Sequence, residues 1–367
     1  MNAVLDIFLH YGIAVIFMLG ILIFIHELGH FWTARLLKVK VDEFSIGFGK
    51  RLFVYKKNNI EYSIRLIPYG GFVKLAGGET RTQSVPNYNE FLAKPLWVKI
   101  LILVAGSSMN MVLAVFLFSN IAFYTGVPDT RPIVGEAIEG KPASISGIKQ
   151  KDIIVQIDEK NIKSWNDMTS VIRNSKGEEL NLKIARDGRD IFLQVTPVLD
   201  KVPDMFGKEQ EIFFIGIAPQ IQHFNLLGSL KEGTRQAYFW STLTLKGLFR
   251  IITGEDKVFK AIGGPLMIAE VTARASRAGF AAFFFIMAII SIALAVINMF
   301  PIPGITDGGH TIVYLFEKAI NRPLSPRAYE IVTRIGFAFI IFLMFIATAA
   351  DVWRFWGQRL FEFLIKK

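Results

Sequence analysis

The feature that most constrains the fold of this chain is a long apolar stretch, about residues 3–37, with ionisable residues in its second half. Because about 20 apolar residues are enough for a helix to cross a bilayer, we predict a membrane span here. Inside the stretch lies the run His26-Glu27-Leu28-Gly29-His30. His26 and His30 are four residues apart and therefore share one face of a helix. Two neutral imidazoles at this spacing can bind one Zn²⁺, and Glu27 can act as the general base.

Three further apolar blocks cover about residues 97–124, 278–300 and 331–352, and the chain of 367 residues is 52% hydrophobic with 33 Phe. These blocks predict a polytopic α-helical membrane protein with about four transmembrane helices. Ionisable side chains inside a span are costly and usually functional, which favours a metal site in the first block over a chance motif. The absence of Cys excludes disulfides and thiol chemistry.

Lys and Arg outnumber Asp and Glu by 41 to 31, which gives a net charge of +10. In a membrane protein this excess reports on orientation and on contact with lipids, and the mixed charges do not indicate a nucleic-acid partner. The loop between the first two blocks, from Arg35 to Lys99, is especially basic. The positive-inside rule therefore predicts that this loop is cytoplasmic and that the N-terminus lies outside. His26 to His30 would then occupy the cytoplasmic half of the bilayer.

Residues 41–75 change to the alternation of polar and apolar positions that is typical of strands, in Glu43–Gly49 and Glu61–Ile67. Lys57-Asn58-Asn59 is predicted to turn between them, and Pro68 to Gly71 to interrupt the second strand. Two interpretations stay open. The segment is either a small cytoplasmic hairpin or a membrane-associated sheet whose edge can pair with an extended substrate.

We predict four parts in the chain. Residues 1–124 form the first membrane half, 125–222 an inserted α+β domain, 223–265 an amphipathic connecting segment and 266–367 the second membrane half. The insert contains short strand-like runs and one helix-like run, at residues 133–138, 152–157, 180–185, 191–195 and 165–173 respectively. Charged residues among Leu, Phe and Trp in 223–253 suit a helix that lies on a membrane surface or braces the insert. Asn110, in the middle of the second span, suits either helix packing or active-site support.

The third span ends in a run that breaks the helix with Pro301 and Pro303 and then reaches an acid, Asp307. A carboxylate at membrane depth needs a buried partner. By parity, the first and third spans reach this depth from the same side, so Asp307 is predicted to be the third zinc ligand, with the fourth position open for catalysis. His310, three residues further on, is the alternative ligand.

Together these residues resemble the site-2 protease family, and most closely the bacterial regulator-of-sigma-E protease group. The resemblance spans nearly the whole chain. It rests on the following segments: His26–His30, Phe44–Gly49, Arg65–Lys74, Ala105-Gly106 with Asn110, Gly263-Gly264-Pro265 and Asn298–Gly309. The insert resembles a PDZ domain through Pro142-Ala143, Gly147-Ile148, Lys151–Ile154 and Ser164-Trp165.

The resemblance implies an intramembrane zinc metalloprotease that cuts transmembrane segments of other proteins in regulated intramembrane proteolysis. Typical substrates are anti-sigma-factor-like proteins and remnant signal peptides, and the PDZ domain restricts access by bulky substrates or takes a peptide ligand. Asn298 and Gly47-Phe48-Gly49 are implied to hold the substrate extended. The implied location is the bacterial inner membrane, in contact with its lipids, with the PDZ domain on the periplasmic side.

The chain departs from the family pattern in two places. It has one PDZ-like domain where many relatives have two, and three residues, Gly304-Ile305-Thr306, separate Pro303 from Asp307 where the family usually has two. A bulge at Gly304 can absorb the extra residue. Two other functions are compatible with parts of the sequence. One is a catalytically inactive membrane scaffold that presents a PDZ domain, and the other is a transporter, whose broken helices also carry charges.

Overall fold

The computed structural model describes residues 2–78, 88–203, 209–255 and 263–365. The described chain forms two compact units. Unit 1 combines residues 1–119 with residues 230–367, and unit 2 is the segment 120–229 between them.

Among the described residues, four helices are long and apolar enough to cross a membrane, which agrees with the predicted number of spans. They are α1 (Asn2–Leu36), α2 (Leu96–Tyr124), α8 (Phe280–Met299) and α10 (Pro326–Ile365). The apolar part of α1 is Gly12–Leu36, and its 25 residues rise by about 37 Å, more than the ~30 Å of a bilayer core. The last span begins before the predicted residue 331 because Pro326 opens the helix at its first turn. The chain is therefore a multi-pass membrane protein.

In the part of the chain that the structure describes, three further helices lie between the spans: α5 (Leu226–Ile252), α7 (Pro265–Ala278) and α9 (Asp307–Ala319). α5 is the amphipathic helix predicted for residues 223–253. α7 packs against α1 and α8. Its first turn is held by the buried carboxylate of Asp351 on α10, which accepts hydrogen bonds from the backbone N–H groups of Gly264 (3.0 Å) and Met267 (2.9 Å). These amides are among the groups that every helix start leaves without an internal partner.

Strands β1 (Val41–Lys57) and β2 (Ile60–Leu75) form the predicted β-rich segment and turn at Asn58 and Asn59, whose φ angles are 52° and 60°. Residues 43–46 of β1 pair with 61–64 on one side and with 71–74 on the other, so β2 wraps around the start of β1. The prediction that Pro68 to Gly71 interrupt the strand is wrong. β2 continues through them because Gly70, with a φ of 131°, accommodates the bend at which the pairing changes.

A charged cluster ties the hairpin together from inside. The Glu43 carboxylate accepts hydrogen bonds from Arg65 (2.7 Å), Ser63 (2.7 Å) and Arg51 (3.0 Å). The Arg65 guanidinium also lies 5.0 Å from the centroid of the Phe72 ring. Burial raises the pKa of Glu43, but the hydrogen bonds from Arg65 and Ser63 outweigh it, so this pKa lies below its ordinary value. Arg65 thereby links both segments that flank residues 43–46.

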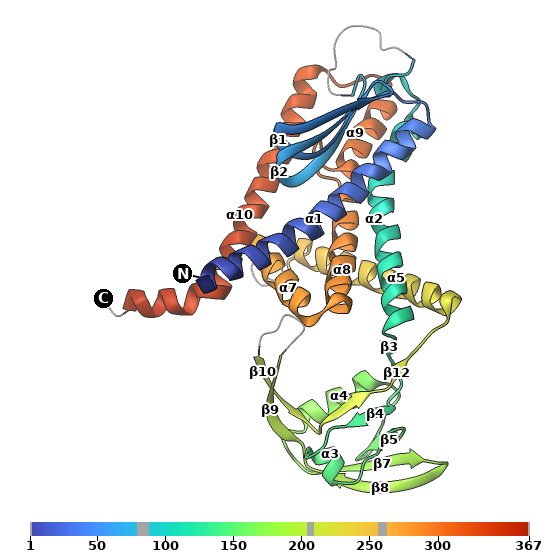
Figure 1. The fold of residues 1–367 in the computed structure, drawn as a ribbon, viewed down its shortest axis with the longest axis vertical. Coiled ribbons are helices and arrows are strands. Elements are labelled where there is room, and N and C mark those ends of the chain that lie inside the picture. Colours follow the sequence, from blue (N-terminus) through green and yellow to red (C-terminus); the bar gives the residue numbers. More distant parts are fainter. Residues whose placement is uncertain (1, 79–87, 204–208, 256–262, 366–367) are drawn as a thin grey trace. The chain divides into compact units, whose positions relative to one another are not determined.

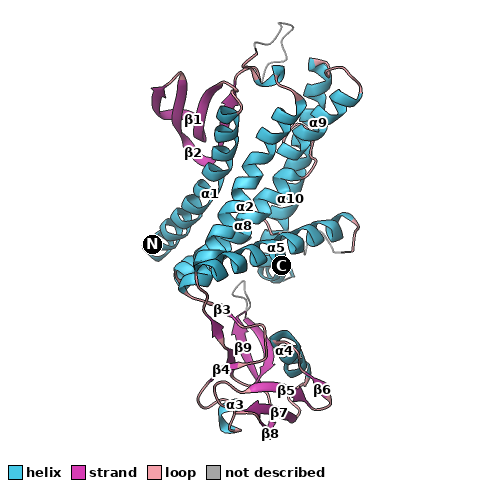
Figure 2. Ribbon diagram, turned by 90° about the vertical axis from the view of Figure 1, so that its right-hand side faces the viewer, coloured by secondary structure: helices cyan, strands magenta, loops and turns pink. Residues whose placement is uncertain are grey.

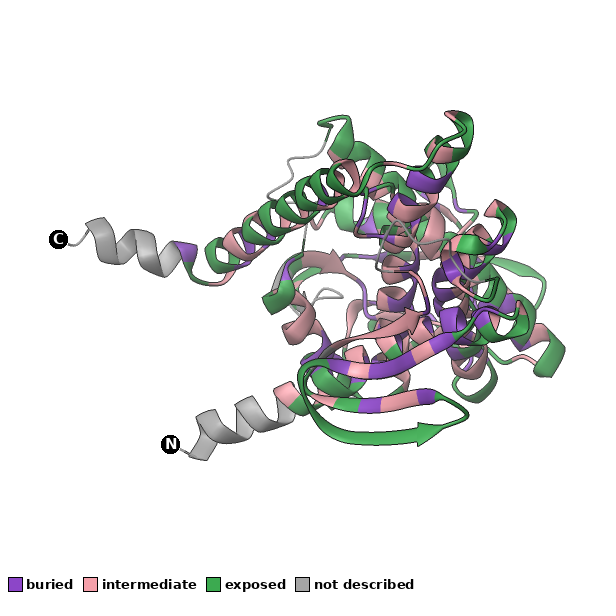
Figure 3. Cartoon of the chain, turned by 90° about the horizontal axis from the view of Figure 1, so that it is seen from above, coloured by how far each residue is buried: buried purple, intermediate pink, exposed green. Residues whose placement is uncertain are grey.

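The hairpin is buried at its base and exposed at its outer end (Figure 3). At the base, the Phe44 ring meets Phe31 of α1 edge to face, with centroids 5.3 Å apart. At the outer end, Leu52 and Phe53 are each 61% exposed. β2 packs along α1, as Figures 1 and 2 show, so the strand next to the His-Glu motif is held in a fixed place.

Unit 2 contains short strands and two helices in its described part. In chain order these elements are β3 (Val127–Pro128), β4 (Val134–Ala137), α3 (Pro142–Ile145), β5 (Ile153–Ile157), β6 (Lys160–Asn161), α4 (Trp165–Asn174), β7 (Leu180–Arg186), β8 (Arg189–Val195), β9 (Val198–Pro203), β10 (Glu209–Phe214), β11 (Ile217–Pro219) and β12 (Ile221–Gln222). Four strands form an antiparallel sheet in the order β6-β5-β7-β8, and the others pair as β4 with β11, β9 with β10 and β3 with β12.

The core of unit 2 lies between this sheet and α4. Ser164 caps α4 by accepting the backbone N–H of Asp167 (3.1 Å), and Met168 and Ile172, one turn apart, face inward. They belong to the same buried cluster as Leu182 of β7, where truncation to Ala would cost roughly 3 kcal/mol. The five predicted runs of the insert agree with β4, β5, β7, β8 and α4 to within two residues at each end.

Candidate metal centre and active site

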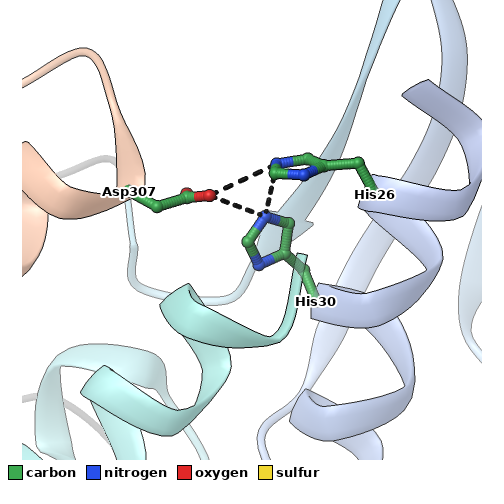
Figure 4. Close-up of side chains that lie close together, drawn as sticks. All are labelled: His26, His30 and Asp307. Atoms are coloured by element: carbon green, nitrogen blue, oxygen red, sulfur yellow. Dashed lines mark hydrogen bonds and ion pairs between the residues drawn. The ribbon is translucent and has the colours of Figure 1, made fainter. Parts of the chain in front are cut away.

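The candidate site lies on α1 where the α8–α9 connection approaches it. His26 and His30, one turn apart, are each 8% exposed. Their Nε2 atoms are 3.1 Å apart, and the rings meet edge to face (Figure 4). Oδ2 of Asp307 lies 3.2 Å from Nε2 of His26 and 3.5 Å from Nε2 of His30. The structure therefore brings the three predicted ligands together.

The connection from α8 to α9 delivers Asp307 to this point. It contains Pro301 and Pro303, both exposed, and Gly304 adopts a positive φ of 74°. The left-handed conformation, which glycine adopts without strain, lies at the position where the sequence predicted a bulge. Thr306 caps α9, so Asp307 is the first residue of that helix. A carboxylate at this position is also favoured by the helix dipole.

The neighbouring helix α2 orients the imidazole of His30 and approaches both rings closely. Nδ1 of His30 lies 2.8 Å from the carbonyl oxygen of Ile102, so Nδ1 carries the proton and Nε2 keeps its lone pair in the neutral ring. α2 can approach this closely because Gly106 has no side chain. A Cβ at Gly106 would collide with Nε2 of His30 and would lie 2.7 Å from Cε1 of His26.

The donor set fits zinc. Oδ2 of Asp307 is buried and has no well-oriented hydrogen-bond donor among the described residues, although two imidazole nitrogens lie within 3.5 Å of it. Two histidine nitrogens and one carboxylate oxygen that converge in this way are a ligand set of catalytic zinc sites, which leave one position open. The arrangement therefore has the ligand types and the closeness that a zinc ion requires.

Glu27 lies beside the imidazoles on α1 and lines the same cavity. Its carboxylate accepts a hydrogen bond from the backbone N–H of Val73 in β2. Gly71 of β2 also lies against it, because a Cβ there would be 3.2 Å from Cγ of Glu27. The strand therefore positions the acid that the sequence predicts to be the general base.

A cavity of about 470 Å³ opens beside the three ligand atoms. Part of its wall is Gly70-Gly71-Phe72-Val73. These residues lie within residues 41–75, for which one of the two open interpretations was an edge that pairs with an extended substrate, but they were not among the predicted site residues. Two consecutive glycines in a strand were the available signal for a close backbone approach. Among the described strands, only β1 pairs with this segment, so no strand adds to its other edge. The apolar lining consists of Leu22, Ile23, Leu75, Ile102, Leu103, Leu294 and Ile305.

Two amide side chains also line the cavity. Nδ2 of Asn298, in the last turn of α8, lies 3.4 Å from Nε2 of His26. Asn110 of α2 is fully buried, and neither of its side-chain polar atoms has a hydrogen-bond partner among the described residues. An unsatisfied buried amide costs about 1–3 kcal/mol, so hydrogen bonding within the described residues does not account for the placement of Asn110.

Gly47-Phe48-Gly49, predicted to hold the substrate, lie in β1 and are not among the residues that line the cavity. The Phe48 ring stacks on Phe72 of the cavity wall, with centroids 6.3 Å apart. His310 does line the cavity, but Nδ1 of this residue lies 3.2 Å from the hydroxyl of Tyr329, and His310 stays outside the cluster of ligand atoms.

Comparison with known proteins identifies a family. The model of Peptidase family M50 matches residues 14–343. The chain is 33% identical to a Clostridium acetobutylicum protein named as a zinc metalloprotease, over 91% of this chain and 94% of that protein. It is 32% identical to a Campylobacter jejuni protein with a name of the same kind, over 94% of each. It is 26% identical to the regulator of sigma-W protease RasP of Bacillus subtilis, over 96% of this chain and all of that protein.

Among solved structures, the PDZ domain of an SdrC-like protein from Listeria innocua matches 26% of this chain and all of that chain, with 23% identity and a TM-score of 0.20. The family model covers more of the chain than this solved structure does. It includes both the helix of His26 and His30 and the connection that carries Asp307. The relatives also match over nearly their full length. This chain belongs to peptidase family M50, the site-2 protease family, and is a zinc metalloprotease.

Proposed function

We propose that this protein hydrolyses peptide bonds within the transmembrane segments of other membrane proteins. The observation that most directly supports this is the position of the ligand cluster. His26 and His30 belong to a helix that is long and apolar enough to cross a membrane, so the chemistry is set at bilayer depth. Ionisable groups are energetically costly at that depth, and those that occur there usually have a function.

His26, His30 and Asp307 are the proposed zinc ligands, and Glu27 is the proposed general base. When bound, zinc supplies the Lewis acidity that polarises the scissile carbonyl. Glu27 accepts the proton of the attacking water and returns it to the leaving amine. The N–H of Val73 holds the Glu27 carboxylate at the cavity.

A transmembrane helix hides its carbonyl groups in internal hydrogen bonds, so the substrate must be extended locally before it can be hydrolysed. The edge at residues 70–72 supports an extended binding mode, since it lines the cavity and could pair with a substrate strand. Asn298 and Asn110 are proposed to donate hydrogen bonds to the extended backbone. Gly47-Phe48-Gly49 remain a predicted contact further along the hairpin.

The proposed substrates are anti-sigma-factor-like membrane proteins and remnant signal peptides, cut in regulated intramembrane proteolysis. Unit 2 is proposed to be a PDZ-like domain that restricts bulky substrates or takes a peptide ligand, and its sheet closed by α4 is compatible with that fold. The proposed location is the bacterial inner membrane. The basic loop from Arg35 to Lys99 supports the orientation in which this loop is cytoplasmic and unit 2 lies on the periplasmic side.

We predict that Glu27→Gln stops cleavage of a reporter transmembrane substrate while the protein stays folded and keeps its zinc. The amide has the shape of the carboxylate but cannot accept the proton, and the loss of a general base costs of the order of 10²–10⁴-fold in rate. Cleavage is followed on gels in detergent, and bound zinc by elemental analysis. Glu136→Gln, at an exposed position of unit 2, is the matched control and should cleave at the wild-type rate.

Comparable turnover by Glu27→Gln would refute the role of Glu27. The substrate class is tested separately with the zinc-loaded wild-type protein. Cleavage of soluble peptides without cleavage of any transmembrane reporter would contradict the proposal that the protein acts on membrane segments.

A further inference from the structure

We propose that the hydroxyl of Thr306 is the positioning group that sets Asp307 against the two imidazoles and thereby sets the affinity of the site for zinc. The inference rests on the proposed ligand set. It concerns a side chain that supplies no ligand atom itself.

The Thr306 hydroxyl uses its full hydrogen-bonding capacity in a buried place, since the residue is 5% exposed. It donates to the carbonyl oxygen of Phe300 at 2.6 Å, the nearer of two acceptors, with the carbonyl oxygen of Ile302 at 3.2 Å. It accepts from the backbone N–H groups of Gly309 (3.1 Å) and Ile302 (3.3 Å). A hydroxyl has one proton and two lone pairs, so every one of them is engaged.

The groups bound by this hydroxyl belong to three successive segments. Phe300 is the C-cap of α8, Ile302 lies in the connection, and Gly309 lies in the first turn of α9. Asp307 follows Thr306 directly. The hydroxyl therefore fixes the start of α9, and with it Asp307, relative to the end of α8, the helix that brings Asn298 to His26.

The backbone around Thr306 is closely packed, so a shift at Thr306 would also displace Asp307. A Cβ on Gly308 or Gly309 would overlap the backbone of Met299 or Ile302. The N–H of Gly309 would lose its acceptor in a buried position if the hydroxyl were removed.

The test compares two substitutions at one position. Thr306→Val replaces the hydroxyl by a methyl group at nearly constant volume, whereas Thr306→Ser keeps the hydroxyl. The purified full-length protein is stripped with a chelator, and its zinc affinity is measured by competition with a chelating dye. Groups that support metal ligands are typically worth 10–100-fold in affinity, so we expect Thr306→Val to bind zinc about 10–100-fold more weakly and Thr306→Ser to bind it nearly as the wild type does.

Ser164→Ala is the matched control for the loss of a helix cap. It removes the hydroxyl that accepts the N–H of Asp167 at the start of α4 in unit 2, and zinc affinity should stay unchanged. Circular dichroism reports the helix content of each variant. If Thr306→Val does not fold, the comparison of Thr306→Ala with Thr306→Ser takes its place, and equal zinc affinities of those two overturn the inference.

Asp307→Ala, measured in parallel, separates this inference from the proposed function. Loss of zinc by Asp307→Ala together with wild-type affinity in Thr306→Val overturns the role of Thr306 and leaves the ligand set standing. Retention of zinc by Asp307→Ala means that Asp307 is not a ligand, and then both proposals about it fail.

Discussion

Because residue 106 has no side chain, the Nε2 atoms of His26 and His30 can lie close together beside α2. A Cβ on Gly106 would collide with Nε2 of His30 and would lie 2.7 Å from Cε1 of His26, so both rings would have to move. The His30 ring cannot retreat without losing its contact with the carbonyl oxygen of Ile102. The site therefore requires a glycine on α2, although its proposed ligands belong to α1 and α9.

We predict that Gly106→Ala lowers zinc affinity by at least about tenfold, because the methyl group displaces the imidazoles from their common point. Zinc is measured by competition with a chelating dye. Gly20→Ala is the matched control, since a Cβ at Gly20 on α1 meets nothing within 4 Å. If both variants bind zinc as the wild type does, the collision at Gly106 is relieved elsewhere and the site does not depend on this glycine.

The amide of Asn110 is fully buried, and its polar atoms have no hydrogen-bond partner among the described residues. We predict that Asn110→Leu keeps bound zinc and does not lower thermal stability, since an apolar group of similar size removes a desolvation cost. Cleavage should fall by roughly 10²-fold if the amide binds the substrate backbone in the transition state. A variant that loses stability but cleaves normally would assign Asn110 to helix packing instead.

At the scale of elements, β2 both contributes to the active-site cavity and closes the hairpin. Its last residues hold Glu27 and form the cavity wall, and its first residues close the hairpin against β1. The ion pair of Arg65 and Glu43 connects these parts, because Arg65 also lies over the ring of Phe72 in the wall. The position of the wall therefore depends on charges inside the hairpin.

We predict that Arg65→Ala lowers the free energy of opening of the hairpin by about 3 kcal/mol, because it leaves the Glu43 carboxylate, only 7% exposed, without its main partner. Hydrogen exchange of the amides in residues 43–46 and 61–64 measures this opening. Arg51→Ala is the control, since the Arg51 side chain is 45% exposed and such pairs contribute less than about 1 kcal/mol. An equal loss of protection in both variants would argue against the cluster as the link.

Elements that local patterns specify could be predicted, and contacts between distant elements could not. The apolar length of α1 and the turn at Asn58 and Asn59 both follow from short stretches of sequence. The sequence indicated a possible substrate-pairing edge within residues 41–75 but did not single out residues 70–73 as the cavity wall, because a proline and two glycines usually end a strand. The contact of the Ile102 carbonyl with His30 has no sequence signal at all, since every residue carries a carbonyl group.

At the scale of the whole chain, the number of spans explains how Asp307 comes to meet His26. Unit 2 follows the second span and precedes the third. If the basic loop after α1 is cytoplasmic, α2 returns the chain to the outside, and α8 brings it back toward the cytoplasm. The end of α8 then reaches the same depth as the motif on α1, which is what a shared metal site requires.

This topology predicts opposite labelling of two single cysteines, which report it cleanly because the chain contains no Cys of its own. Arg173→Cys lies on α4 of unit 2 and Lys57→Cys lies at the end of β1, and both positions are exposed. We expect the first to react with a membrane-impermeant thiol reagent in intact cells, or in spheroplasts where an outer membrane blocks the reagent, and the second to react only after the inner membrane is lysed. The reverse pattern would invert the orientation while keeping the parity of the spans. Labelling of both in intact cells would place the hairpin and unit 2 on the same side, and the parity that brings Asp307 to His26 would then be wrong.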